Sequence, residues 1–186
     1  MTYSEYLAAE AVAEVRHEYL KGEVWAMAGG TIEHGALALA VAGELRAALR
    51  GKPCRAFSSD VRVRIPETDL ATYPDLSVVC GKLETAADDK DAITNPIVLV
   101  EVLSDSTEAY DRGAKAAHYR RIASLREYVL VSQNEPRIEV HRRAESGRWE
   151  LLEARPGETI DLTSLGVRLD VAAVYANPLD EAAARS

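Results

Sequence analysis

Apolar and polar positions follow two different periods along this chain, and the strand period is the commoner. From Asp60 to Ile65 apolar and polar side chains alternate, which predicts a strand with one buried face. Two longer runs, YPDLSVVCG (residues 73–81) and PIVLVEVL (96–103), are dominated by apolar side chains, as buried strands are. Further strands are expected at 127–132, 137–143, 148–154 and 167–175, with a turn at 134–136 between the first two.

Helical spacing dominates in three other stretches. Residues 2–15 are expected to form a short amphipathic helix, and residues 31–50 a long one capped by Thr31. The inward stripe of the long helix is His34, Leu37, Ala38, Val41, Leu45 and Ala48. A third helix is expected over residues 106–123, capped by Ser106 or Thr107.

Two connecting stretches complete the reading. Residues 17–27 form a predicted hairpin turning at Lys21-Gly22, and the acidic segment 82–95 is expected to be a loop. No repeat or linker interrupts the pattern, so one domain is expected over residues 1–186. Its predicted fold class is mixed α/β, with a sheet flanked by helices.

One residue does not suit its predicted strand. Glu101 lies within the apolar run 96–103, where a carboxylate is costly to bury unless it is paired or holds a metal ion. Asp75 follows Pro74, near the start of the predicted strand in 73–81. It would meet Glu101 if that strand and the strand in 96–103 are neighbours. Mg²⁺ prefers such hard oxygen ligands together with several waters. Two simpler readings stay open, a turn aspartate at position 75 and an arginine partner for Glu101.

Lys115 is the third candidate for chemistry. It lies four residues after Asp111 and four before Tyr119, so all three side chains share one helix face. Its ammonium group either makes a solvated pair with Asp111 or lies over the sheet edge. At the sheet edge it would orient a water molecule or stabilise charge on a phosphate.

The segments YPDLSVVCG, PIVLVEVLSDSTEAYDRGAKAAHYRRI and LREYVLV together resemble the Uma-two-type endonucleases. These form a branch of the restriction-endonuclease-like PD-(D/E)XK superfamily, and the resemblance extends over nearly the whole chain. It implies a restriction-endonuclease-like mixed sheet flanked by helices. It also implies that Asp75, Glu101 and the backbone carbonyl of Val102 bind Mg²⁺ or Mn²⁺.

This chain departs from the superfamily pattern at one position. The superfamily lysine normally stands two residues after the second acid, where this chain has Leu103. The resemblance implies that Lys115, on the following helix, takes its place. Asp75, Glu101 and Lys115 would then be the catalytic residues.

Three accessory residues are weaker candidates. His34 opens the inward stripe of the long helix, where a hydrogen-bonded core histidine is the alternative, and the resemblance favours a role in the site. Glu44 lies near Glu33 around that helix, as an accessory acid or a solvated flank residue. Tyr119 is expected to pack against the sheet with its hydroxyl near the mouth of the site. Asp60 is read as structural, and Ser104, Ser106 and Thr107 as turn and cap groups.

Net charge, cysteine content and the apolar runs indicate which partners the protein binds and where in the cell it is located. The 186 residues carry a net charge of −8, which argues against a polyanion partner. Residues 112–148 contain nine Lys/Arg against four Glu, a local excess of +5 that nucleic acid or plain solvation would explain. Cys54 and Cys80 are expected to be reduced thiols. No apolar run approaches the ~20 residues of a membrane span, and the N-terminus has no signal-peptide core, so a cytoplasmic location is expected.

The leading hypothesis is a Mg²⁺- or Mn²⁺-dependent endonuclease that hydrolyses DNA phosphodiester bonds. Two alternatives remain open, a catalytically silent nucleic-acid- or protein-binding module and a metal-dependent hydrolase of a small phosphoester. A homodimer is expected, because a double-strand cut needs two sites and exposed strand edges need covers.

Overall fold

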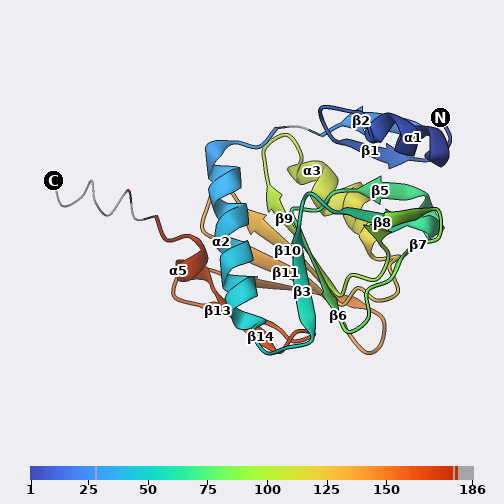
Figure 1. Ribbon diagram of the computed structural model, residues 1–186. Helices are drawn as coiled ribbons and strands as arrows, with labels where there is room; N and C mark the ends of the chain where they lie inside the picture. The colour runs from blue at the N-terminus through green and yellow to red at the C-terminus, as the bar shows by residue number, and fades with distance from the viewer. Residues whose placement is uncertain (28, 178, 180–186) are drawn as a thin grey trace.

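Two six-stranded mixed sheets make up most of the computed structural model, which describes residues 1–27, 29–177 and 179 (Figure 1). The first, here called the central sheet, has the order β12-β11-β10-β9-β6-β3, in which only β9 and β10 run parallel. Its strands are β3 (Cys54–Ser58), β6 (Leu76–Cys80), β9 (Val98–Leu103), β10 (Glu127–Ser132), β11 (Ile138–Arg143) and β12 (Trp149–Ala154).

The second sheet has the order β2-β1-β5-β4-β8-β7 and lies beside the central sheet (Figure 1). Its strands are β1 (His17–Leu20), β2 (Glu23–Ala26), β4 (Arg62–Ile65), β5 (Leu70–Thr72), β7 (Thr85–Ala86) and β8 (Asp89–Ile93). A two-stranded ribbon, β13 (Thr159–Leu162) with β14 (Val167–Asp170), lies near the carboxyl-terminal end. The expected mixed α/β fold class is therefore confirmed.

Some local expectations were wrong. The acidic segment 82–95 contains β7 and β8, whose Ala86, Ala92 and Ile93 are buried, so burial against the fold outweighs the polar composition. The strands β5 and β13 were not expected. The last predicted strand ends at Asp170 and continues as the short helix α5 (Val171–Val174), capped by the Asp170 carboxylate.

The helices begin where expected but differ in length. α1 (Tyr3–Glu10) is shorter than predicted and begins with a capping box of Thr2 and Glu5. α2 (Ile32–Ala48) is capped by the Thr31 hydroxyl, which accepts from the backbone N–H of His34.

The third predicted helix is shorter than expected and changes type along its length, without a gap between its three parts. α3 (Glu108–Tyr110) is followed by a π-helical turn, η2 (Asp111–Lys115), and by α4 (Ala116–Tyr119). The expected cap is absent, because the Thr107 side chain does not bond to the first turn and its hydroxyl lies 2.9 Å from that of Ser104.

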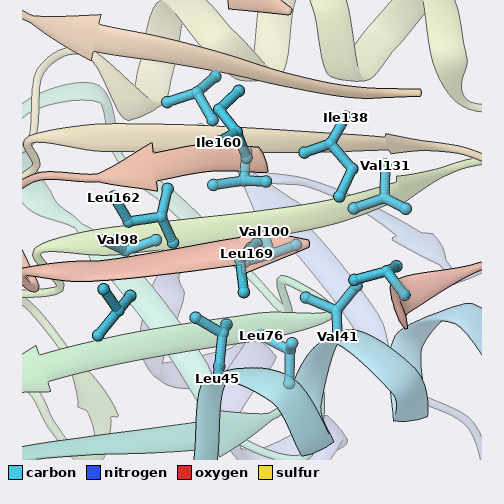
Figure 2. Packing of buried hydrophobic residues seen from close by; sticks show 14 of the residues in the cluster. Val41, Leu45, Leu76, Val98, Val100, Val131, Ile138, Ile160, Leu162 and Leu169 are labelled. Carbon is cyan, nitrogen blue, oxygen red and sulfur yellow. The ribbon is translucent and has the colours of Figure 1, made fainter. Parts of the chain in front are cut away.

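Side chains of β9 point alternately into two hydrophobic clusters, one on each face of the central sheet. Val98, Val100 and Val102 pack against α2, and Figure 2 shows Val41 and Leu45 close to this face. Leu99 and Leu103 point the other way, toward the second sheet and the run of α3, η2 and α4 (residues 108–119), here called the helical segment. Because successive strand residues face opposite sides, Glu101 shares the face of Leu99 and Leu103.

The expectation of two reduced thiols was wrong. Cys54 and Cys80 are joined by a disulfide bond. They stand directly opposite each other in the antiparallel pair of β3 and β6, and only this pairing brings them together. No helix in the described part of the chain is long and apolar enough to cross a membrane.

The packing of α2 gives a test of the core. Leu45 is fully buried against the central sheet, whereas Leu39 on the same helix is 74% exposed. We expect Leu45→Ala to lower the free energy of unfolding by about 2–5 kcal/mol, and Leu39→Ala to change it by less than about 0.5 kcal/mol. Urea unfolding followed by circular dichroism measures both, and equal effects would contradict this packing.

Candidate functional site

Strand register brings Asp75 and Glu101 together. β6 and β9 are antiparallel with Leu76 opposite Val100, so the next pair along the register is Asp75 with Glu101. The backbone N–H of Val102 donates to Asp75 Oδ2 at 2.7 Å, which fixes that carboxylate at the end of the strand. Both carboxylates line one cavity of about 530 Å³, at the end of the central sheet.

Glu101 is 4% exposed, and its two partners come from the helical segment. Its Oε1 accepts from Tyr119 Oη at 2.6 Å and lies 2.8 Å from Lys115 Nζ. Burial raises the pKa of Glu101 to about 8, with further upward pressure from the Asp75 and Asp111 charges and opposition from Lys115. Lys115 is thus the group that favours the charged form of Glu101.

Lys115 stands at the centre of a carboxylate cluster. Its Nζ lies 3.3 Å from Glu18 Oε1 and 3.5 Å from Asp111 Oδ1, in addition to its contact with Glu101. Burial alone would lower the pKa of Lys115, but these three carboxylates raise it well above its ordinary value. The predicted pairing with Asp111 is present, though it is buried rather than solvated. The π-helical turn that holds both residues is a feature often found at functional sites.

Glu18 is a member of this cluster that sequence reasoning missed. It lies on β1, is nearly fully buried and accepts a hydrogen bond from the Thr72 hydroxyl on β5. The sequence HEYL gave no signal for it, because polar and apolar residues do not alternate there, and Glu18 and the adjacent Tyr19 are both buried. The pairing of β1 with β5 decides the matter.

His34 lies at the cavity, at the start of α2. Its Nε2 is 3.3 Å from Asp75 Oδ2, and the hydrogen bond to Asp75 raises the pKa of His34. Gly30 leaves room for the ring, because a Cβ there would lie 2.9 Å from His34 Nδ1. The structure therefore brings His34 beside the predicted carboxylate rather than into the apolar core.

The other two accessory candidates lie elsewhere than expected. Glu44 is exposed on α2 and does not line the cavity. Tyr119 is fully buried behind Glu101, so its hydroxyl is not at the mouth of the site. Burial, together with the Glu101 charge, raises the pKa of Tyr119 well above its ordinary value. The phenol therefore keeps its proton and donates a hydrogen bond to Glu101.

The walls of the cavity are aromatic and polar. They come from the hairpin β1–β2, the start of α2, and the segment between β9 and η2. The remaining described lining residues are Trp25, Ala26, Met27, Gly29, Gly30, Thr31, Tyr73, Ser104, Asp105, Ser106, Thr107, Tyr110 and Gln133. Among the described residues of this lining, Lys115 is the only lysine or arginine.

The locally basic segment is only partly neutralised by local contacts. Arg112 pairs with Glu108 and Glu139, and Arg142 pairs with the buried Glu127. Arg143 donates to backbone carbonyls at the end of the helical segment. Part of the +5 excess lies at the surface, on the exposed side chains of Arg120, Arg121, Arg126 and Arg148.

The carboxylates at the cavity are candidate ligands for a divalent cation. Within residues 1–27, 29–177 and 179, no group of three or more His, Cys, Asp or Glu side chains is placed to hold a metal ion. Mg²⁺, however, is commonly bound by only one or two carboxylates and keeps several waters. Asp75 and Glu101 supply two, and four carboxylates share the neighbourhood with one lysine, an excess of negative charge that a cation would offset. These residues fit a hard, largely hydrated cation.

The chain is similar to known proteins in sequence over most of its length. The Uma2 family model, described as "Putative restriction endonuclease", matches residues 3–172. An uncharacterized protein of Synechocystis sp., slr1290, is 34% identical over 171 residues, covering 92% of this chain and 89% of the relative. A second one, sll1609, is 31% identical over 153 residues, covering 82% of this chain and 86% of the relative.

A solved structure has the same fold. It is described as a "putative nuclease" from Anabaena variabilis and superposes with a TM-score of 0.75 at 16% identity. The alignment covers 94% of this chain and 98% of that chain.

Removing the lysine tests the charge balance of the cluster. We expect Lys115→Met to lower the free energy of unfolding at pH 7 by about 3–5 kcal/mol, because buried carboxylates lose their cation. Lys90→Met, at an exposed position on β8, should change it by less than about 0.5 kcal/mol. Urea unfolding measures both values, and a mild effect at Lys115 would mean that the cluster is not charged as described.

Glu101 predicts a pH dependence of stability. Its pKa is about 8 in the folded protein against an ordinary 4.5, so between these values the folded state holds a proton that the unfolded chain has lost. Stability of the metal-free protein should therefore fall as pH rises from 5 to 8. Glu101→Gln should make this slope less steep by up to about 1.4 kcal/mol per pH unit. Urea unfolding across pH 5–9 measures it, and the exposed Glu150→Gln should keep the wild-type slope.

Proposed function

This chain belongs to the Uma2 family, described as "Putative restriction endonuclease", and from that membership we propose that it is a Mg²⁺- or Mn²⁺-dependent endonuclease that hydrolyses DNA phosphodiester bonds. One observation carries the proposal. Two carboxylates from neighbouring strands, Asp75 and Glu101, open into one cavity with a buried lysine beside them. A donor set of this kind suits phosphoryl chemistry, in which charge is concentrated on oxygen atoms.

We propose that Asp75, Glu101 and the carbonyl of Val102 hold the cation. When bound, it supplies Lewis-acid polarisation of the phosphodiester and makes water a stronger nucleophile. The chain keeps these ligands in place. The Val102 N–H orients Asp75, and Tyr119 orients Glu101. Glu101 thereby keeps its position although it lies in an apolar strand.

Lys115 is proposed to stabilise negative charge on the phosphate or to orient the attacking water. Its position explains how Leu103 can replace the superfamily lysine. Leu103 is 3% exposed and belongs to the core cluster of Tyr119 and Leu130, which suits an apolar side chain. From η2 the lysine reaches Glu101 at 2.8 Å, so the charge arrives from the helix instead of the strand.

Two further expectations accompany the proposal. His34, held by Asp75, is proposed as an accessory group that positions this carboxylate. A homodimer is also proposed, because exposed strand edges of the sheets need covers.

Nicking of supercoiled plasmid tests the function. We expect cleavage with Mg²⁺ or Mn²⁺ and none in EDTA. Asp75→Asn and Glu101→Ala should each lower the cleavage rate at least about 100-fold, as should Lys115→Ala if it acts in the transition state. Glu150→Gln, an exposed acid on β12, should cleave at the wild-type rate.

Circular dichroism of each variant shows whether its fold is retained. No cleavage by the wild-type protein with either metal would point to the silent binding module. Cleavage of a small phosphodiester but not of plasmid would point to the small-substrate hydrolase. Plasmid cleavage that survives Glu101→Ala in a folded variant would place the chemistry elsewhere.

A further inference from the structure

The wall of the cavity next to the carboxylates contains an aromatic pair with no evident role in the proposed chemistry. Trp25 lies on β2 and Tyr110 at the end of α3, with ring centroids 6.5 Å apart and an interplanar angle of 86°. The hairpin register sets Trp25 directly opposite Glu18, so its side chain shares the face of the carboxylate cluster. The Tyr110 ring in turn has Lys115 Nζ 5.9 Å from its centroid. The aromatic pair therefore borders the proposed reaction site.

Tyr110 also carries a polar group in need of a partner. Its hydroxyl is buried and makes no hydrogen bond within the described residues. Buried hydroxyl groups are nearly always paired, and an ordered water or an ion is a usual partner for one without a protein partner. The indole of Trp25 is only partly buried, so an aromatic surface remains accessible at the same wall.

The size and charge of the cavity argue against a paired double helix inside it. Its volume of about 530 Å³ lies within the usual range of small-molecule pockets. Duplex binding relies on many Lys and Arg contacts to phosphates. Here the only lysine or arginine in the described lining is Lys115, which is 6% exposed and already holds three carboxylates. A base can stack on an aromatic side chain only after it has left the double helix.

We propose that Trp25 and Tyr110 form a stacking subsite for one unpaired nucleobase, and that the substrate is single-stranded DNA or an unpaired stretch within a duplex. The inference rests on the proposed nuclease function, whose reaction site adjoins the subsite. The base stacks on the aromatic wall. Its flanking phosphate then lies toward Asp75 and Glu101. Stacking rather than phosphate neutralisation supplies the affinity, which explains how an acidic protein binds this polyanion.

The two tryptophans of the chain allow a direct test. Trp149 lies on β12, outside the cavity lining. In the variant Trp149→Phe, Trp25 is the only tryptophan that fluoresces. In the variant Trp25→Phe, Trp149 is the only one. With Mg²⁺ present, a short oligothymidylate should quench the fluorescence of Trp25 in the first variant and leave that of Trp149 in the second unchanged. A blunt duplex of equal length should quench Trp25 at least about ten-fold less effectively at equal concentration, because its bases remain paired.

Cleavage provides a second measurement. Trp25→Leu should raise the KM for single-stranded DNA about ten-fold, the size expected from loss of one base-stacking contact. Trp25→Phe, which retains a ring, should raise it less than about three-fold. Circular dichroism checks that both variants keep their fold. If they do not, the fluorescence measurement on Trp149→Phe still tests the subsite, because Trp25 is unchanged in that variant.

The outcomes separate this inference from the nuclease proposal. Quenching of Trp25 by single strands without cleavage under either metal would support the subsite and overturn the nuclease. Cleavage of blunt duplex as fast as of single strands, with Trp25 unresponsive, would overturn the subsite and leave the nuclease standing. Quenching by thymidine monophosphate at the same dissociation constant as the oligonucleotide would overturn the strand substrate in favour of a small phosphoester.

Discussion

The contact between Lys115 and Glu101 is the interaction on which the site depends. Glu101 lies in an otherwise apolar strand, where an unpaired charge would be costly. Lys115 approaches from the helical segment at 2.8 Å and is itself buried among Glu18, Asp111 and Glu101. Burial favours the protonated form of Glu101 and Lys115 favours its charged form, so the position of the lysine sets how this carboxyl titrates. The contact also couples the position of the helical segment to the position of β9.

The fold provides this arrangement by covering the two faces of the central sheet differently. On one face, α2 packs against Val98, Val100 and Val102 in an apolar core cluster (Figure 2). On the other face the helical segment lies between the two sheets, and its inward face changes along its length. Tyr119 joins the apolar cluster, whereas Asp111 and Lys115, in the wider π-helical turn, meet the carboxylates. The cavity opens where the apolar packing ends.

The elements around the cavity have separate tasks under the proposed function. The central sheet supplies Asp75 and Glu101 on adjacent strands, and the helical segment supplies the cation. The hairpin β1–β2, from the second sheet, contributes a buried acid and an aromatic wall from directly paired positions, Glu18 and Trp25. Recognition and chemistry thus come from adjoining parts of one cavity, so the joining of the two sheets through a shared core decides how a substrate would meet the carboxylates.

Local patterns in the sequence were enough for the fold class, α2 with its Thr31 cap, the main strands, and the anomaly at Glu101, because periodicity and capping act over a few residues. The shared helix face of Asp111 and Lys115 was also a local property. Tertiary structure alone decided the rest. Strand pairing over long sequence separations joined Cys54 to Cys80 and brought Glu18 to Lys115. It also turned the acidic segment 82–95 into β7 and β8. Such contacts depend on which strands become neighbours. The spacing of apolar residues along a chain predicts which face of a strand or helix is buried, but not which other element covers that face.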